Sequence, residues 1–131
     1  MKALFVAFVA SVVLCFALPA AAHHSFAAEF DINKPVSLKG SLTKMAWVNP
    51  HGWIYMDVKG ADGRIESWAI ETGNPFRMKK RGLTKDDFCP GSEVIIIGYP
   101  AKQGERKAAG MMITFTDRDA AGKESTFPLG R

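Results

Sequence analysis

The chain has 131 residues, with 17 Lys and Arg against 13 Asp and Glu, and only 2 cysteines. The formal net charge of +4 is modest, so the composition gives no reason to expect nucleic acid as a partner. Cys15 lies in the leader described next and Cys89 stands alone, which excludes an internal disulfide framework.

The first 22 residues have the three parts of a bacterial signal peptide. Lys2 supplies the positive charge, residues 4–18 are apolar, and Ala20-x-Ala22 is a small-residue cleavage signature. We expect cleavage after Ala22 and a periplasmic or secreted protein that begins at His23, with no stable membrane insertion after cleavage. An uncleaved N-terminal anchor is the alternative. The remaining 109 residues form one domain that needs neither a disulfide nor a metal to fold.

Residues 23–35 show no sustained hydrophobic period and are expected to form an N-terminal arm, with Phe26 and Phe30 as docking points. From residue 36 onward, alternating apolar and polar residues predict β-strands, and the apolar run at residues 93–99 suits a strand buried on both faces. Capping residues predict a short helix that starts at Pro75 and ends near Gly82. The predicted strands cover residues 36–48, 53–59, 64–71, 93–99 and 108–116, and a short last strand lies near 126–127.

Three strands, a helix and further strands follow one another in the order of an OB-fold. We therefore predict a mainly β fold over residues 36–131: a five- to six-stranded OB-like β-barrel with one short helix between strands 3 and 4. A six-stranded sandwich is the competing architecture. The strand pattern predicts that one core contains Ile54, Val58, Val94, Ile96 and Ile113.

Three short segments of the mature chain are distinctive: His23-His24-Ser25-Phe26, Trp47-Val48-Asn49-Pro50-His51 and Pro90-Gly91-Ser92-Glu93-Val94. With a Gly-rich hairpin at residues 60–63 and the pair Gly98-Tyr99, they resemble a family of small exported bacterial proteins known only as a domain of unknown function. The resemblance covers nearly all of the mature chain. It implies a secreted or periplasmic location and a β-rich fold, and it implies no activity.

The three histidines of the chain are His23, His24 and His51. After cleavage, His23 offers an α-amine and an imidazole, which together can chelate one metal ion, and His51 can add a third nitrogen. Such a set would resemble the histidine brace of secreted copper enzymes and periplasmic copper carriers, and nitrogen-rich tetragonal sites suit Cu(II). His24 is a competing ligand, and the thioethers of Met45 and Met56 suit Cu(I). The alternative is a solvated terminus and a turn histidine without metal.

Aromatic residues flank the turn Asn49-Pro50-His51-Gly52. By alternation with the core positions, they are predicted to share an outer face with Met45, where OB-folds bind ligands. Aromatic rings there stack on sugars, bases or peptide side chains. The predicted ligand-binding residues are Trp47, Asn49, His51, Trp53 and Tyr55. Two alternatives are that the arm covers this face, which we favour, and that the first strand bends so that Trp47 enters the core.

Other chemical groups have ordinary structural explanations. The basic residues at 77–81 complement a helix C-terminus and are expected to be solvated, with anionic lipid or envelope polysaccharide as the alternative partner. Asp57, Glu66 and Glu71 lie on predicted strands, where a solvated face explains them. The lone Cys89 is interpreted as buried packing.

No nucleophile elbow, phosphate loop or dinucleotide fingerprint occurs in the sequence. We therefore expect an exported, non-enzymatic OB-like binding module for an unknown small ligand or envelope protein. Its working surface is expected at the Asn49-Pro50-His51-Gly52 turn and the arm. The alternative is a periplasmic copper-binding accessory protein that uses His23 and His51. A copper oxidase would need the same brace and an open coordination position.

Overall fold

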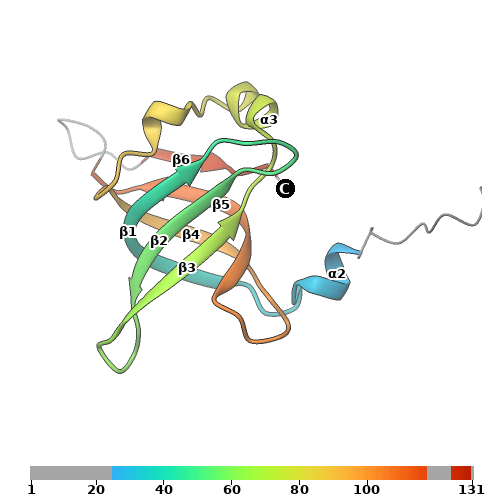
Figure 1. The fold of residues 1–131 in the computed structure, drawn as a ribbon, viewed down its shortest axis with the longest axis vertical. Helices are drawn as coiled ribbons and strands as arrows, with labels where there is room; N and C mark the ends of the chain where they lie inside the picture. The colour runs from blue at the N-terminus through green and yellow to red at the C-terminus, as the bar shows by residue number, and fades with distance from the viewer. Residues whose placement is uncertain (1–24, 118–124, 131) are drawn as a thin grey trace, which may run out of the picture.

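The computed structural model describes residues 25–117 and 125–130, so the predicted signal peptide, His23 and His24 lie outside the described residues. In chain order, with the labels of Figure 1, the elements are α2 (Phe26–Glu29), β1 (Val36–Ala46), β2 (Trp53–Lys59), β3 (Ile65–Glu71), α3 (Pro75–Lys80), the 3-10 helix η1 (Lys85–Asp87), β4 (Glu93–Pro100), β5 (Lys107–Phe115) and β6 (Ser125–Pro128). None of the described helices is long and apolar enough to cross a membrane.

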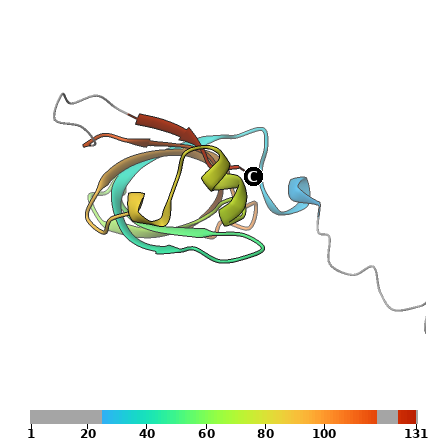
Figure 2. The same cartoon turned by 90° about the horizontal axis from the view of Figure 1, so that it is seen from above.

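The strands form one sheet in the order β3-β2-β1-β4-β5-β6. A parallel pairing of β3 with β5, from Ala69↔Lys107 to Glu71↔Ala109, closes the first five of these strands into a barrel. The last strand, β6, adds to β5 outside this ring (Figures 1 and 2). The predicted OB-like barrel with a helix between strands 3 and 4 is therefore confirmed, and the β3–β5 closure excludes the sandwich.

Strand β1 is shared between the two sides of the barrel. It pairs with β4 over Val36–Ser41 and with β2 over Gly40–Ala46. At Gly40 the backbones approach so closely that an added Cβ would lie 2.0 Å from the carbonyl oxygen of Asp57. Only glycine fits this position, because any side chain would collide with the neighbouring backbone.

A register shift between Leu42 and Lys44 interrupts the β1–β2 ladder. After it, Met45 stands opposite the core residue Ile54, and Met45 and Trp47 are partly buried against the core. The prediction that these two residues lie on the outer face is therefore wrong. One extra residue in a strand moves every following side chain to the other face, so the alternation could not be extrapolated beyond the shift.

Helix α3 covers one end of the barrel (Figures 1 and 2). The side chain of Asn74 caps it by accepting a 2.9 Å hydrogen bond from the backbone N–H of Arg77. Met78 and Leu83 are fully buried beneath it. The core continues through the barrel and includes all five predicted members, Ile54, Val58, Val94, Ile96 and Ile113.

Candidate functional site

The N-terminal arm docks on the barrel through its aromatic residues. Phe30 is fully buried and forms an isolated antiparallel bridge with Ala101. The ring centroid of Phe26 lies 5.1 Å from that of Phe30 and 6.0 Å from that of Tyr99. The backbone N–H of Lys102 also donates to the carbonyl of Glu29. The expected docking role of Phe26 and Phe30 is therefore confirmed.

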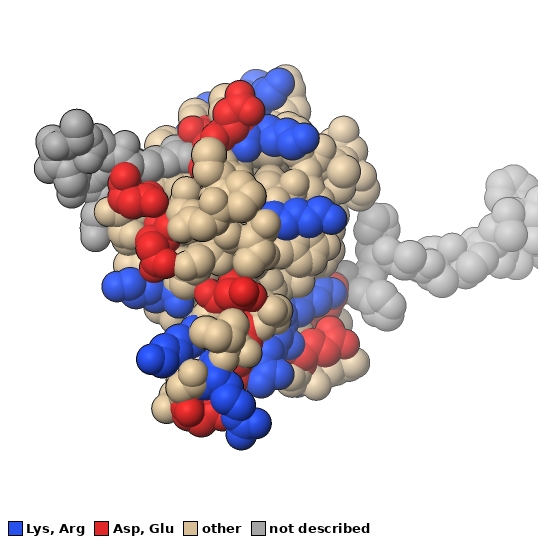
Figure 3. Space-filling view, turned by 60° about the vertical axis from the view of Figure 1, so that its left-hand side comes forward, with Lys and Arg blue, Asp and Glu red and all other residues tan. Residues whose placement is uncertain are grey.

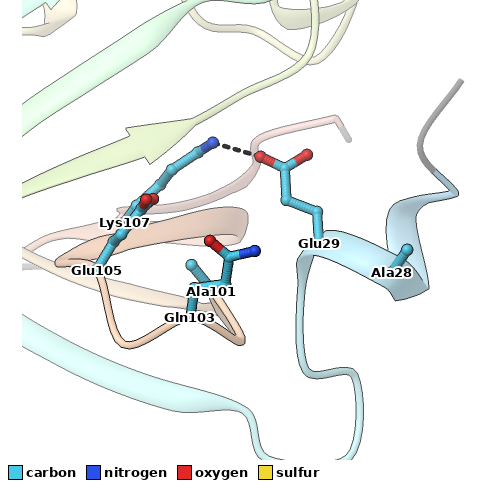
Figure 4. A pocket seen from close by; sticks show the side chains of 6 residues that line it. All are labelled: Ala28, Glu29, Ala101, Gln103, Glu105 and Lys107. Atoms are coloured by element: carbon cyan, nitrogen blue, oxygen red, sulfur yellow. Dashed lines mark hydrogen bonds and ion pairs between the residues drawn. The ribbon is translucent and has the colours of Figure 1, made fainter. Parts of the chain in front are cut away.

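Lys107, the first residue of β5, joins the arm to the barrel. Its ammonium group forms an ion pair with Glu29 of α2, across a cavity of about 270 Å³ (Figure 4). The same nitrogen lies 5.5 Å from the ring centroids of both Phe30 and Trp53. A cation over two aromatic faces is an attractive arrangement. The residue over the half-buried Trp53 is therefore Lys107 of β5, whereas Phe26 and Phe30 pack toward Tyr99 and Ala101, and covering of the aromatic face by the arm stays a prediction.

The turn between β1 and β2 holds His51 at a defined position. Asn49 and Pro50 are exposed and joined by a cis peptide bond. Behind them Gly52 is buried, where its N–H donates to the carbonyl of Gly73 and its carbonyl accepts from the N–H of Thr72. These backbone hydrogen bonds fasten the base of the turn to the segment that follows β3.

His51 has one nitrogen in the protein interior. Its Nδ1 is buried without a hydrogen-bond partner among the described residues, and it lies 3.8 Å from Oε1 of Glu71. The His51 side chain as a whole is 42% exposed, whereas that of Glu71 is 8% exposed. The exposed surface of the imidazole therefore belongs to the rest of the ring, which includes Nε2. A distance of 3.8 Å is too long for a hydrogen bond, but a modest ring rotation would shorten it.

Burial of Glu71 corrects the expectation of a solvated strand face. Glu71 is the last residue of β3, and it pairs across the ladder with Trp53. A series of contacts links the arm to the turn. Glu29 forms an ion pair with Lys107, whose ammonium group lies over the ring of Trp53. Trp53 pairs with Glu71 in the β2–β3 ladder, and the carboxylate of Glu71 lies beside His51. Figures 1 and 2 place α2 and the β1–β2 turn on the same side of the barrel.

The described side chains alone do not make a metal centre. In residues 25–117 and 125–130, no group of three or more His, Cys, Asp and Glu side chains is arranged to hold a metal ion. The ligand set predicted from the sequence includes His23 and His24, which lie outside these residues. Of the two candidate thioethers, Met56 is fully buried in the core, whereas Met45 is partly buried near Gly52.

Tyr55 faces a second feature, a groove of about 650 Å³ on the outside of β1, β2 and β3. The tyrosine is 36% exposed, and the ammonium group of Lys44 lies 5.7 Å from its ring centroid. Arg106 borders the groove and donates a 2.8 Å hydrogen bond to Glu66, which lowers the pKa of the Glu66 carboxyl. The groove is lined by Thr43, Lys44, Tyr55, Met56, Ser67, Trp68, Ala69 and Arg106.

The five predicted ligand-binding residues therefore occupy three places. Asn49 and His51 lie at the turn, Trp53 lies under Lys107, and Tyr55 lies in the groove. Trp47 turns inward, and its ring centroid lies 6.0 Å from that of Phe88. Sequence reasoning missed Glu71 as the neighbour of His51 and Lys107 as the residue that joins the arm. Neither could be recognised from local pattern, because both contacts join residues that are distant in sequence.

Cys89 is exposed, and its thiol donates a 3.3 Å hydrogen bond to the carbonyl of Asp86. Its interpretation as buried packing is therefore wrong, because Pro90 and Gly91 turn the chain at the surface before β4 begins.

The chain was also compared with known proteins. The model of a family of unknown function, DUF6152, matches residues 10–111. No curated protein and no solved structure matches the chain. The resemblance to a domain of unknown function is thus confirmed.

Proposed function

The chain belongs to the DUF6152 family, whose function is unknown, and we propose that it is an exported, non-enzymatic OB-like binding module whose ligand is copper. The proposed working surface consists of the Asn49-Pro50-His51-Gly52 turn and the docked N-terminal arm. The proposed metal ligands are the α-amine and imidazole of His23 together with the imidazole of His51.

The buried Nδ1 of His51 beside Glu71 is the observation that carries this proposal. Histidines that bind metals commonly donate their second ring N–H to a carboxylate, which fixes the tautomer and the orientation of the ring. A small rotation of His51 would let Nδ1–H donate to Glu71. The other nitrogen, Nε2, would then be the one available to a metal ion.

The docked arm supports a contribution from His23. The structure begins at Ser25, two residues after His23, and an extended chain spans at most about 3.6 Å per residue. Helix α2, which follows Ser25, and the β1–β2 turn lie on the same side of the barrel (Figures 1 and 2). An α-amine and two imidazoles form the nitrogen-rich set that suits Cu(II).

Competition titration with Cu(II) tests the ligand set in protein matured by export. His51→Ala should lower the affinity more than His24→Ala. The fold should persist in His51→Ala because the His51 side chain is 42% exposed at a surface turn. A larger loss for His24→Ala would indicate simple chelation by the terminal His-His pair and would contradict the proposed role of the turn.

A second candidate ligand is suggested by the groove on β1, β2 and β3. The exposed ring of Tyr55 stands near a lysine, an arginine and the hydroxyl of Ser67. This combination suits a polar ligand with a flat apolar face, such as a sugar ring, and OB-folds bind oligosaccharides on this side.

Titration with short neutral and uronic-acid oligosaccharides, followed by amide NMR shifts, tests the groove. Shifts should cluster at the groove and disappear in Tyr55→Ala. They should persist in the control Ile97→Ala, which changes another exposed apolar residue, on β4. Shifts that are absent, or that survive Tyr55→Ala, would rule out this second candidate.

A further inference from the structure

Positive charge is concentrated in one segment of the chain. Residues 74–89 contain five Lys and Arg against two Asp, whereas the rest of residues 23–131 contains eleven residues of each sign. The entire formal excess of positive charge in the predicted mature chain therefore comes from α3 and the loop that follows it. The basic residues are Arg77, Lys79, Lys80, Arg81 and Lys85.

The same helix carries a large exposed apolar side chain. Phe76 is 65% exposed, and the ammonium group of Lys80 lies 4.7 Å from its ring centroid. A single exposed aromatic residue is ordinary on a protein surface. Its position within the segment that holds the excess positive charge makes it distinctive here.

The barrel holds this surface rigidly. Met78 is fully buried on the inner side of α3, Asn74 caps the helix, and Leu83 anchors the chain after it. Phe76 and the basic residues at 77 and 79–81 remain exposed. Phe76 and the four basic residues Arg77, Lys79, Lys80 and Arg81 are called the α3 face below.

The nearby acidic groups neutralise the α3 face only in part. Asp87 accepts hydrogen bonds from the backbone and side chain of Thr84 in a capping box, and Asp86 is its exposed neighbour. Figure 3 shows Lys and Arg among Asp and Glu in both the upper and the lower part of the view, so the feature of the α3 segment is its net excess of positive charge. A net positive charge at one end of the molecule orients it toward an anionic partner.

We propose that the α3 face docks on the surface of a bilayer that contains anionic phospholipid. The basic side chains contact the lipid phosphates, and the ring of Phe76 enters the boundary between headgroups and acyl chains. Surface-bound helices combine Lys and Arg with exposed Phe, Trp or Leu in this way. The apolar ring favours a lipid surface over a soluble polysaccharide, which offers no hydrocarbon. This proposal uses none of the proposed copper ligands and does not depend on copper binding.

Sedimentation with phosphatidylcholine vesicles, with and without phosphatidylglycerol, tests the proposal. The wild-type protein should bind the anionic vesicles and be released by salt, because exposed charges are screened. K79Q/K80Q should lower the partition coefficient about 25-fold, at about fivefold for each basic residue. Phe76→Ser should also weaken binding, because the ring no longer enters the bilayer.

The matched control is K34Q/K39Q, which removes two exposed lysines outside the α3 face. This control should lose much less binding than K79Q/K80Q. Equal losses would show attraction by net charge alone and would overturn the proposal. Absence of binding to anionic vesicles, or unchanged binding by Phe76→Ser together with binding of wild-type protein to a soluble anionic polysaccharide, would also overturn it. Urea unfolding should confirm that all variants remain folded.

Discussion

The backbone beside His51 is held by hydrogen bonds, whereas its Nδ1 has no partner among the described residues. Gly52 next to it is buried, and an added Cβ there would lie 2.6 Å from Oγ1 of Thr72. The turn is therefore fixed against the segment after β3, and this brings His51 to the buried carboxylate of Glu71. A ring fixed at its base needs little rearrangement to bind a ligand, which lowers the entropic cost of binding.

Glu71→Gln tests the positioning role of this carboxylate. The amide keeps the shape of the side chain but removes the negative charge that favours Nδ1–H on the buried side. When a metal-binding histidine loses the group that accepts from its second ring N–H, the metal affinity typically falls about 10- to 100-fold. We expect a loss in this range in Cu(II) competition titrations. If Glu71→Gln leaves the affinity unchanged while His51→Ala lowers it, then Glu71 is a structural residue only.

Individual site residues were only partly predictable. His51 was identified because histidine is rare in this chain and lies in a turn cluster. Trp47 was placed on the wrong face because the register shift after Leu42 leaves no clear signal in the alternation. Glu71 was interpreted as solvated because its burial arises from the turn and from the closure by β5, which are not local to its strand.

At the scale of elements, the N-terminal arm belongs to the folded domain. Phe30→Ala should destabilise the protein by about 3–5 kcal/mol, the usual cost of truncating a buried Phe. The control Phe76→Ala, at a residue 65% exposed, should change the stability by no more than about 0.5 kcal/mol. Urea unfolding measures both values. Similar values for the two variants would show that the arm does not contribute to the fold.

Strand β4 provides a second matched pair at adjacent positions. Ile96 is fully buried, whereas Ile97 is 43% exposed, so the expectation that the apolar run forms a strand buried on both faces is wrong. Ile96→Ala should cost about 2–5 kcal/mol because it leaves a cavity in the core. Ile97→Ala should cost much less in the same unfolding experiment. A loss of unfolding free energy below about 0.5 kcal/mol for Ile96→Ala would contradict the central position of β4.

Strands β1 and β2 were well predicted because apolar and polar residues alternate along them, as in β2, where every second residue is buried, whereas β4 was predicted from its apolar run. The short helix was predicted from its capping residues. Asn74 caps it, and Pro75 is its first residue. The missed features were the register shift in β1 and the one-turn helix α2, which is too short to produce a helical period.

At the scale of the whole molecule, the order of elements predicted the barrel, and the parallel β3–β5 pairing closes it. That closure joins residues almost 40 positions apart, so no local pattern reveals it. It also brings Lys107 to the arm and to Trp53, which joins the N-terminus to the barrel.

Export should produce the N-terminus that the copper site requires. The intact mass of protein recovered from the periplasm of an expressing bacterium should correspond to residues 23–131. The Ala20-x-Ala22 signature places the cleavage immediately before His23. A mass that retains residues 1–22 would contradict both the proposed location and the free α-amine of His23.

The central claim is tested most directly by the effect of blocking the α-amine of His23 on Cu(II) affinity. Acetylation of the N-terminus of the protein that begins at His23 converts this α-amine into an amide, which is no longer a basic ligand nitrogen, while the three imidazoles and the described fold are unchanged. The two proteins, each with its N-terminus confirmed by mass, are titrated with Cu(II) against the same competitor. We predict that the protein with a free His23 α-amine binds at least about tenfold more tightly than the acetylated protein, because it has one more nitrogen ligand. Equal affinities would contradict a copper site built on the mature N-terminus.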